Sequence, residues 1–124
     1  MNEVWLSLGS NCDDRARNVE KASEWLPEVI ESCICSHIYE TPEIHGIGTP
    51  YYNAVVRGET KLDISELNRM LKEYEVLSGR DLSARERGEV PIDIDIVIWN
   101  KEIVRPKDYF HTFFQIGYSE ITEN

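Results

Sequence analysis

The segment Ile92–Ile96 has the sequence Ile-Asp-Ile-Asp-Ile. Side chains two positions apart project from the same face of a β-strand, so Asp93 and Asp95 are expected to lie together, roughly 6 to 7 Å apart. Two ionised carboxylates at that distance repel by about 2 to 3 kcal/mol when the effective dielectric constant is near 20. We therefore expect a cation between them.

Two kinds of cation suit this acid pair. The first is a guanidinium, and Arg80, Arg85 and Arg87 all stand in the charged segment before the strand. The second is one or two magnesium ions carrying the phosphates of a nucleotide, because Mg²⁺ prefers hard oxygen ligands. The acid pair by itself does not decide between these two possibilities.

Hydrophobic periodicity predicts the elements that position the pair. Strands are predicted over residues 3–8, 29–39, 52–60 and 91–99. Helices are predicted from Asp13 or Asp14 to Pro27, and from Asp63, in a capping box with Glu66, to Gly79. Residues 41–50 and 80–89 lack periodicity and are predicted to be loops, the second of them mobile.

Two of these strands have a predicted apolar face. In the strand over 29–39, the residues expected to share one face are Ile30, Ile34 and Ile38. In the strand over 91–99, the residues expected on the buried face are Ile92, Ile94, Ile96 and Ile98. This places Asp93, Asp95, Asn53 and Tyr39 on the opposite, more open face.

The order strand, helix, strand, strand, helix, strand predicts an α+β fold, and more specifically a ferredoxin-like split βαβ sandwich (βαββαβ). Its antiparallel sheet would carry both helices on one face. At 124 residues the chain, 1–124, is expected to be a single domain. We expect a monomer or a weak homo-oligomer.

Composition restricts the partners. A net charge of -10 argues against binding to nucleic acid or to an anionic membrane. The chain has no run of about 18 apolar residues and no basic N-terminal region, so we expect a cytoplasmic protein that binds small molecules. Three cysteines, among them Cys33 and Cys35, form no metal spacing and are expected to be buried free thiols.

Five motifs in order give the chain a family resemblance. They are Leu8–Asn11, Tyr39–Pro42, Pro50–Ala54, Glu75 with Gly79-Arg80, and Ile92–Ile96. Together they resemble the hydroxymethyldihydropterin pyrophosphokinases of folate biosynthesis. The resemblance implies Mg²⁺-dependent transfer of pyrophosphate from the co-substrate ATP to 6-hydroxymethyl-7,8-dihydropterin, with release of AMP.

The resemblance also implies roles for individual residues. Asp93 and Asp95 would hold two Mg²⁺ ions. The reduced pterin would be bound by Thr41, Pro42, Tyr51, Asn53 and Phe113. The nucleotide would be bound by Lys72, Glu75, Ile96 and Lys107, and the catalytic arginines would be Arg80, Arg85 and Arg87.

The chain departs from the family pattern in its arginines. Leu82 and Val90 stand where two phosphate-binding arginines are expected, and His111 stands where another is expected. If each lost cation costs about 2 to 4 kcal/mol, two losses without substitutes would slow turnover roughly 10³-fold or more. The alternative function is therefore a catalytically weak or inactive pterin-binding or regulatory relative. A ferredoxin-like interaction domain is a third reading.

Overall fold

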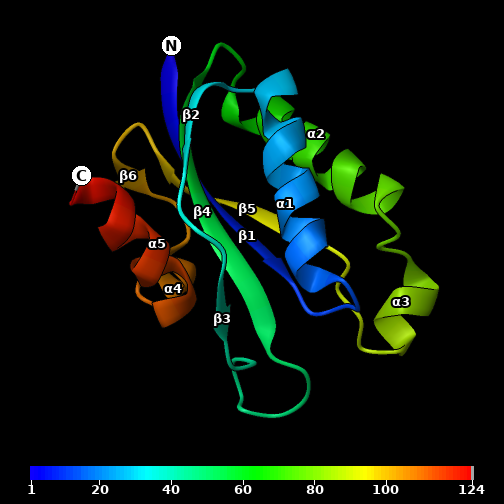
Figure 1. Ribbon diagram of the computed structural model, residues 1–124. Coiled ribbons are helices and arrows are strands. Elements are labelled where there is room, and N and C mark those ends of the chain that lie inside the picture. The colour runs from blue at the N-terminus through cyan, green and yellow to red at the C-terminus, as the bar shows by residue number, and fades with distance from the viewer. Residues whose placement is uncertain (124) are drawn as a thin grey trace.

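The computed structural model describes residues 1–123, and its central feature is one six-stranded antiparallel sheet (Figure 1). The strands are β1 (Asn2–Ser10), β2 (Glu31–Cys35), β3 (Tyr39–Thr41), β4 (Tyr51–Thr60), β5 (Asp93–Trp99) and β6 (Glu102–Ile103). Their order is β2-β4-β1-β5-β6, and β3 also pairs with β4. The predicted α+β class with an antiparallel sheet is confirmed.

Helices cover both faces of the sheet (Figure 1). They are α1 (Arg15–Trp25), the short 3₁₀ helix η1 (Leu26–Glu28), α2 (Ile64–Leu77), α3 (Leu82–Glu86), α4 (Pro106–Tyr109) and α5 (Thr112–Thr122). The two predicted helices, α1 and α2, share one face and bury the larger core, which contains Leu8, Leu67 and Ile94. The unpredicted C-terminal helices lie on the other face, where Phe114 and Ile121 of α5 pack against Val55.

Local signals place α2 well and α1 less well. Asp63 and Glu66 form the predicted capping box, with Glu66 N donating to Asp63 Oδ1 at 2.8 Å. At α1, Asp14 occupies the N-cap position with φ 58°, but its side chain makes no capping hydrogen bond. The segment 80–89, predicted to be a loop, contains α3, because the Asp81 side chain caps it by accepting from Ala84 N.

The strand predicted over 29–39 is wrong in its length and faces. It is two strands, β2 and β3, and the register between β2 and β4 shifts between Glu31 and Ile34. Ser32 within β2 takes φ 55°. As a result Ile34 is 49% exposed, while Ile30 and Ile38 pack into the core beneath α1 and α2. The shift reverses the side-chain alternation at Ile34, and the break between β2 and β3 returns Ile38 to the core side.

A similar shift in β5 corrects the second predicted face. Leu6 pairs with Ile96 and Trp5 with Ile98, which leaves Val97 as an extra residue in β5. Ile96 therefore packs under α1 and α2, whereas Ile98 packs with Trp5 in the core under α5. Asp93 and Asp95 precede this irregularity, so their alternation is preserved.

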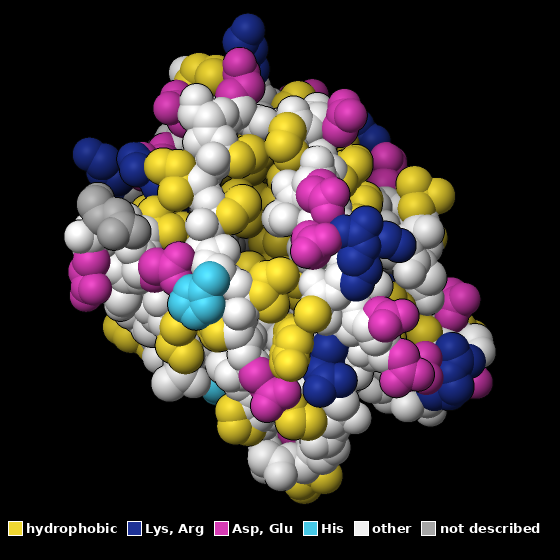
Figure 2. Space-filling model, viewed as in Figure 1, with side chains coloured by type: hydrophobic (Ala, Val, Ile, Leu, Met, Phe, Trp, Pro, Cys, Tyr) yellow, Lys and Arg dark blue, Asp and Glu magenta, His cyan; other side chains and the backbone are white. Residues whose placement is uncertain are grey.

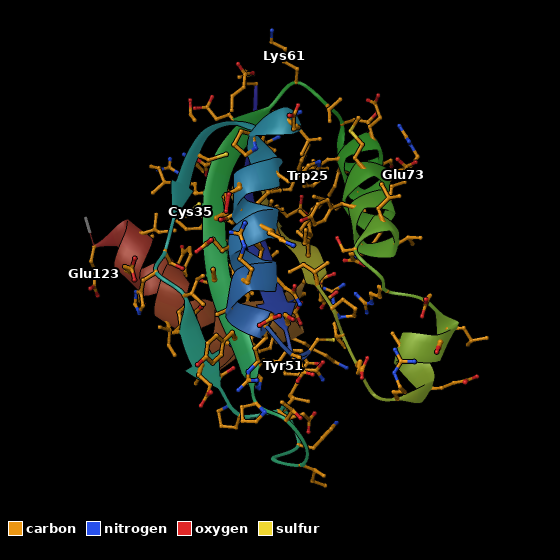
Figure 3. The ribbon with its side chains drawn as sticks, turned by 45° about the vertical axis from the view of Figure 1, so that its right-hand side comes forward. Trp25, Cys35, Tyr51, Lys61, Glu73 and Glu123 are labelled. Atoms are coloured by element: carbon orange, nitrogen blue, oxygen red, sulfur yellow. The ribbon has the colours of Figure 1, made fainter. Side chains whose placement is uncertain are left out.

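The cysteines are free thiols, as predicted, but they are not buried. Cys12 and Cys33 are half-buried, and Cys35 is exposed on the edge strand β2 (Figure 3). None of the helices in residues 1–123 is both long enough and apolar enough to cross a bilayer.

Gly117 allows α5 to pack closely on the sheet. A Cβ atom at this position would lie 2.5 Å from Val55 Cγ2 and 3.0 Å from Ser36 Oγ. Gly117→Ala is expected to destabilise the protein by about 1 to 3 kcal/mol, because the helix must move away from the sheet. The free energy of unfolding in urea measures this effect.

The sign of the change makes this test decisive. A glycine-to-alanine change inside an unobstructed helix stabilises it by about 1 kcal/mol, so a stabilised Gly117→Ala variant would contradict the close packing. Ile116→Ala on the same helix, where the side chain is 42% exposed, is the control. We expect a change of about 0.5 kcal/mol or less there.

Candidate functional site

Both aspartates open onto one cavity. Asp93 pairs with Gly9 of β1 and Asp95 with Ser7, on the sheet face opposite α1 and α2. The cavity has a volume of about 210 Å³. Its lining consists of Ser7, Gly9, Thr41, Pro42, Glu43, Ile44, Tyr51, Asn53, Asp93, Asp95, Arg105, Asp108 and Phe113. The predicted placement of Asp93, Asp95 and Asn53 on the sheet face opposite α1 and α2 is thus confirmed, but that face is not open throughout, because α5 packs on part of it.

Two cations from the α2 side also reach the acid pair. Lys72 Nζ lies 3.1 Å from Asp95 Oδ1, and Arg80 Nη1 lies 2.7 Å from Asp93 Oδ1. Both cations bind the buried Glu75, each at 2.9 Å, and Glu75 Oε2 also accepts from Ile94 N at 2.8 Å. Glu75 is therefore a buried bridge between the cations and β5.

The two cations only partly offset the repulsion between the acids. Burial raises the pKa of Asp95, and so do the charge of Asp93 and a hydrogen bond with it, against the lowering effect of Lys72. For Lys72, burial acts to lower the pKa, but the hydrogen bond with Glu75 and the charge of Asp95 outweigh it and the pKa is raised. The surroundings of Asp95 thus favour an added positive charge.

The acid pair fits a magnesium ion by its chemistry. The donors are hard carboxylate oxygens, and Lys72 and Arg80 engage Oδ1 of each aspartate, leaving Oδ2 outside these ion pairs. Within residues 1–123 no cluster of three or more histidine, cysteine, aspartate or glutamate side chains is placed to hold a metal. Any metal held by Asp93 and Asp95 would need further ligands from water or from substrate phosphates, as Mg²⁺ commonly does.

The residues predicted to bind the pterin all line the same cavity. Asn53 is 4% exposed, and its Nδ2 donates to Thr41 Oγ1 at 2.6 Å and to the Tyr51 carbonyl at 3.4 Å. Tyr51 lies at the start of β4, beside the loop that follows β3 (Figure 3). Phe113 is positioned by Tyr39, whose hydroxyl donates to the Phe113 carbonyl. Burial raises the pKa of Tyr39 to about 12, so this donor stays protonated.

The residues predicted to bind the nucleotide are only partly brought together. Lys72 and Ile96 line a second cavity of about 380 Å³ that also reaches Asp95 and Arg105. Glu75 instead lines the neighbouring groove that contains Lys72 and Arg80, and it is occupied by its ion pairs with them. Lys107 is exposed on α4 and lines neither cavity.

The three predicted catalytic arginines lie in different surroundings. Arg80 binds Asp93, and Arg85 lines a neighbouring groove together with Arg80 and Val90. Arg87 is exposed and pairs with Glu89 at 3.0 Å. Leu82, at the start of α3, is 70% exposed. Oppositely charged side chains adjoin one another on the face seen in Figure 2, which carries no continuous basic patch.

Sequence reasoning missed Arg105 and Asp108, which both line the first cavity. Their only sequence signal is an i,i+3 pair around Pro106, which by itself is a weak helix-start pattern. The motif Leu8–Asn11 contacts the segment that precedes β5. Asn11 Oδ1 accepts from Val90 N at 2.6 Å and its Nδ2 donates to the Gly88 carbonyl at 3.0 Å, so Asn11 positions the segment that enters β5.

Comparison with known proteins agrees with this geometry. The chain matches the family described as 7,8-dihydro-6-hydroxymethylpterin-pyrophosphokinase over residues 5–123. It is 36% identical over 112 residues to the 2-amino-4-hydroxy-6-hydroxymethyldihydropteridine pyrophosphokinase of Aquifex aeolicus, covering 86% of this chain and 67% of that protein.

Two longer relatives are folate synthesis bifunctional proteins. The one from Arabidopsis thaliana is 36% identical over 101 residues, which cover 80% of this chain and 21% of that protein. The one from Chlamydia trachomatis is 37% identical over 108 residues, which cover 82% and 24%. This chain therefore spans less than a quarter of each bifunctional relative. The match over residues 5–123 shows that the chain belongs to the 7,8-dihydro-6-hydroxymethylpterin-pyrophosphokinase family.

Proposed function

We propose that the protein transfers pyrophosphate from ATP to the hydroxymethyl group of 6-hydroxymethyl-7,8-dihydropterin in folate biosynthesis, in a Mg²⁺-dependent reaction that releases AMP. One observation carries this proposal. Asp95 lines both the cavity that holds the predicted pterin residues and the adjacent cavity with Lys72 and Ile96. A phosphate chain held at this junction would lie between the two substrates, which is where positioning accelerates group transfer.

In the first cavity, Asn53 is proposed to recognise the pterin through its amide oxygen Oδ1, which can accept from an N–H on the polar edge of the ring while Nδ2 donates to the protein. Thr41 Oγ1 and the Tyr51 carbonyl hold that amide in one orientation. Tyr51 and Phe113 are proposed to stack on the ring, and Pro42 to close the pocket beside them.

At the junction, Asp93 and Asp95 are proposed to hold two Mg²⁺ ions. Bound there, Mg²⁺ would neutralise phosphate charge and orient the transferred group. Lys72 and Arg80 would keep positive charge beside the phosphates, with Arg85 in the neighbouring groove. Arg87 and Lys107 lie farther out, and we propose only a long-range electrostatic contribution from them.

We also infer that the fold is a variant of the ferredoxin-like sandwich and that residues 1–123 form one domain. The sheet order β2-β4-β1-β5, with every neighbouring pair antiparallel, supports this inference. In a split βαβ sandwich the first and third main strands are central, as β1 and β4 are in this sheet. The strands β3 and β6 and the helices α4 and α5 would be additions to that plan.

Incubation with reduced hydroxymethylpterin, ATP and Mg²⁺ tests the function directly. We expect one AMP to be released for each pterin converted, as measured by chromatography. If no AMP forms while the pterin still raises the melting temperature, the protein is the pterin-binding relative and not an enzyme. If neither pterin nor an ATP analogue shifts melting, the ligand assignment itself is wrong.

Gly9 provides a test of the pterin pocket. A Cβ atom at this position would lie 3.3 Å from Asn53 Oδ1 and 3.5 Å from Tyr51 Cδ2. Gly9→Ala is expected to weaken pterin binding by about 10-fold, because the contact displaces an amide that must keep its orientation. The pterin-induced shift in melting temperature measures this loss.

The matched control is the shift produced by Mg²⁺ and ATP on the same Gly9→Ala variant. The apparent affinity for Mg²⁺ and ATP derived from that shift is expected to stay within about twofold of the wild-type value, because Gly9 does not line the second cavity. Equal losses for both ligands would indicate general disruption of the sheet and would contradict a pterin-specific role.

A further inference from the structure

We infer that Arg105 binds the phosphate chain of the nucleotide at the junction of the two cavities, a role that rests on the proposed function. Arg105 and Asp95 are the two residues that line both the 210 Å³ cavity and the 380 Å³ cavity. A cation at this position faces both the acid pair and the space beside Lys72 and Ile96. A ligand that extends over both cavities would lie beside Arg105 and Asp95.

The guanidinium of Arg105 is held along one edge. Its Nε donates to Asp108 Oδ2 at 2.7 Å, and Asp108 is three residues farther along, in α4. The backbone is fixed as well, since Val104 N and Arg105 N both donate to the Val97 carbonyl of β5. The side chain is thus positioned by the strand that carries Asp93 and Asp95.

The other edge of the guanidinium is free. Among residues 1–123, no acceptor meets either Nη group of Arg105, and the side chain is 50% exposed. Lys72 and Arg80, by contrast, already bind Glu75 and the two aspartates. Arg105 is therefore a cation whose remaining donors are available to a ligand.

These features select the ligand chemistry. A planar guanidinium with one edge anchored presents its two Nη groups as a fork, which matches two oxygens of a phosphate chain. Asp93 and Asp95 beside it would repel a bare anion, so the fitting ligand is an oligophosphate that carries a divalent cation. Such a contact would supply charge that the apolar Leu82 and Val90 cannot supply.

Arg105→Gln removes the charge and keeps most of the side-chain length. We expect its affinity for inorganic triphosphate with Mg²⁺, and for ATP with Mg²⁺, to fall by about 10- to 100-fold in calorimetric titrations. The pterin-induced melting shift is expected to be unchanged. Arg105→Lys is expected to recover part of the loss, because lysine restores a point charge without the fork.

Arg17→Gln is the matched control, since Arg17 is a half-exposed, ion-paired arginine on α1, on the other face of the sheet. Its binding of triphosphate with Mg²⁺ is expected to equal that of the wild-type protein. If Arg105→Gln binds ATP and triphosphate as tightly as the wild-type protein does, the inference is overturned and the proposed function stands. Failure of the wild-type protein to bind ATP with Mg²⁺ would overturn both.

A third result would also overturn the inference. If Arg105 only neutralises the two aspartates, Arg105→Gln should bind Mg²⁺ alone more tightly and should bind triphosphate as well as wild type does. Titration with Mg²⁺ in the absence of phosphate separates that electrostatic role from phosphate binding.

Discussion

Asp95→Asn is expected to lower turnover by about 10³-fold or more, because it removes a carboxylate proposed to hold the metal at the junction of the two cavities. The same substitution is expected to raise the melting temperature of the metal-free protein. An amide keeps the size of the side chain and removes a charge that the folded structure disfavours. Turnover is expected to fall and the melting temperature to rise, because both depend on the negative charge that the substitution removes.

The stability effect follows from the raised pKa of Asp95. Burial and the nearby charge of Asp93 favour the protonated form, so near the acid range the folded state holds more protons than the unfolded state. Stability therefore falls as the pH rises through the window between the unfolded and the raised folded pKa. At pH values above this window the cost is fully present, and Asp95→Asn removes it while Lys72 keeps its ion pair with Glu75.

Two variants make the test specific. Asp93→Asn is expected to reduce turnover to a similar degree but to stabilise the protein less, because the Asp93 side chain is 37% exposed and that of Asp95 only 14%. Asp13→Asn, at an exposed position before α1, is expected to change neither quantity. A lower melting temperature for metal-free Asp95→Asn would show that the ion pair with Lys72 outweighs burial and repulsion.

Short-range signals predicted those parts of the fold that depend on neighbouring residues. The bounds of α2, β1 and β4 were predicted closely. The bounds of α2 follow from the capping box of Asp63 and Glu66, which depends on local hydrogen bonding, and those of the two strands follow from hydrophobic patterning and simple two-sided burial. The faces of Ile34 and Ile98 could not be predicted, because register shifts against β4 and β1 are properties of strand pairs. A single strand's sequence does not contain them.

In the site, too, features that depend on local sequence were predictable and features that depend on long-range contacts were not. The acid pair of β5 was predictable from its alternation, and the cavity joins it to the predicted pterin residues. The buried state of Glu75 was not predictable, since a glutamate on a helix is usually solvated. Arg105 was missed because its position depends on how the chain folds back along β5 after β6, a long-range contact with only a weak local signal.

Glu75 carries the largest expected effect on stability. Its side chain is 6% exposed and joins Lys72, Arg80 and the backbone N–H of Ile94. Glu75→Ala is expected to destabilise the protein by about 2 to 4 kcal/mol, because it leaves a buried N–H without an acceptor and two cations without their shared partner. Both cations are about 40% exposed, and solvent screening limits the loss to this range.

Glu75→Gln separates the two contributions. Its amide oxygen can still accept from Ile94 N, so we expect about half the loss of stability seen for Glu75→Ala. Urea unfolding measures both variants. Glu73→Gln is the control on the same helix, where the ion pair with Arg69 is exposed and is expected to contribute about 0.5 kcal/mol or less.

The loss of charge at Glu75 should also affect how Asp93 and Asp95 bind Mg²⁺. Without Glu75, the ion pairs that Lys72 and Arg80 make within residues 1–123 are those with Asp95 and Asp93, so the cations are expected to compete with Mg²⁺ more strongly. We expect the Mg²⁺ concentration for half-maximal AMP release to rise by about 10-fold in Glu75→Gln. An unchanged Mg²⁺ requirement together with the expected loss of stability would show that Glu75 supports the fold only. A raised requirement would show that this buried glutamate restrains the two cations from neutralising the carboxylates that the metal needs.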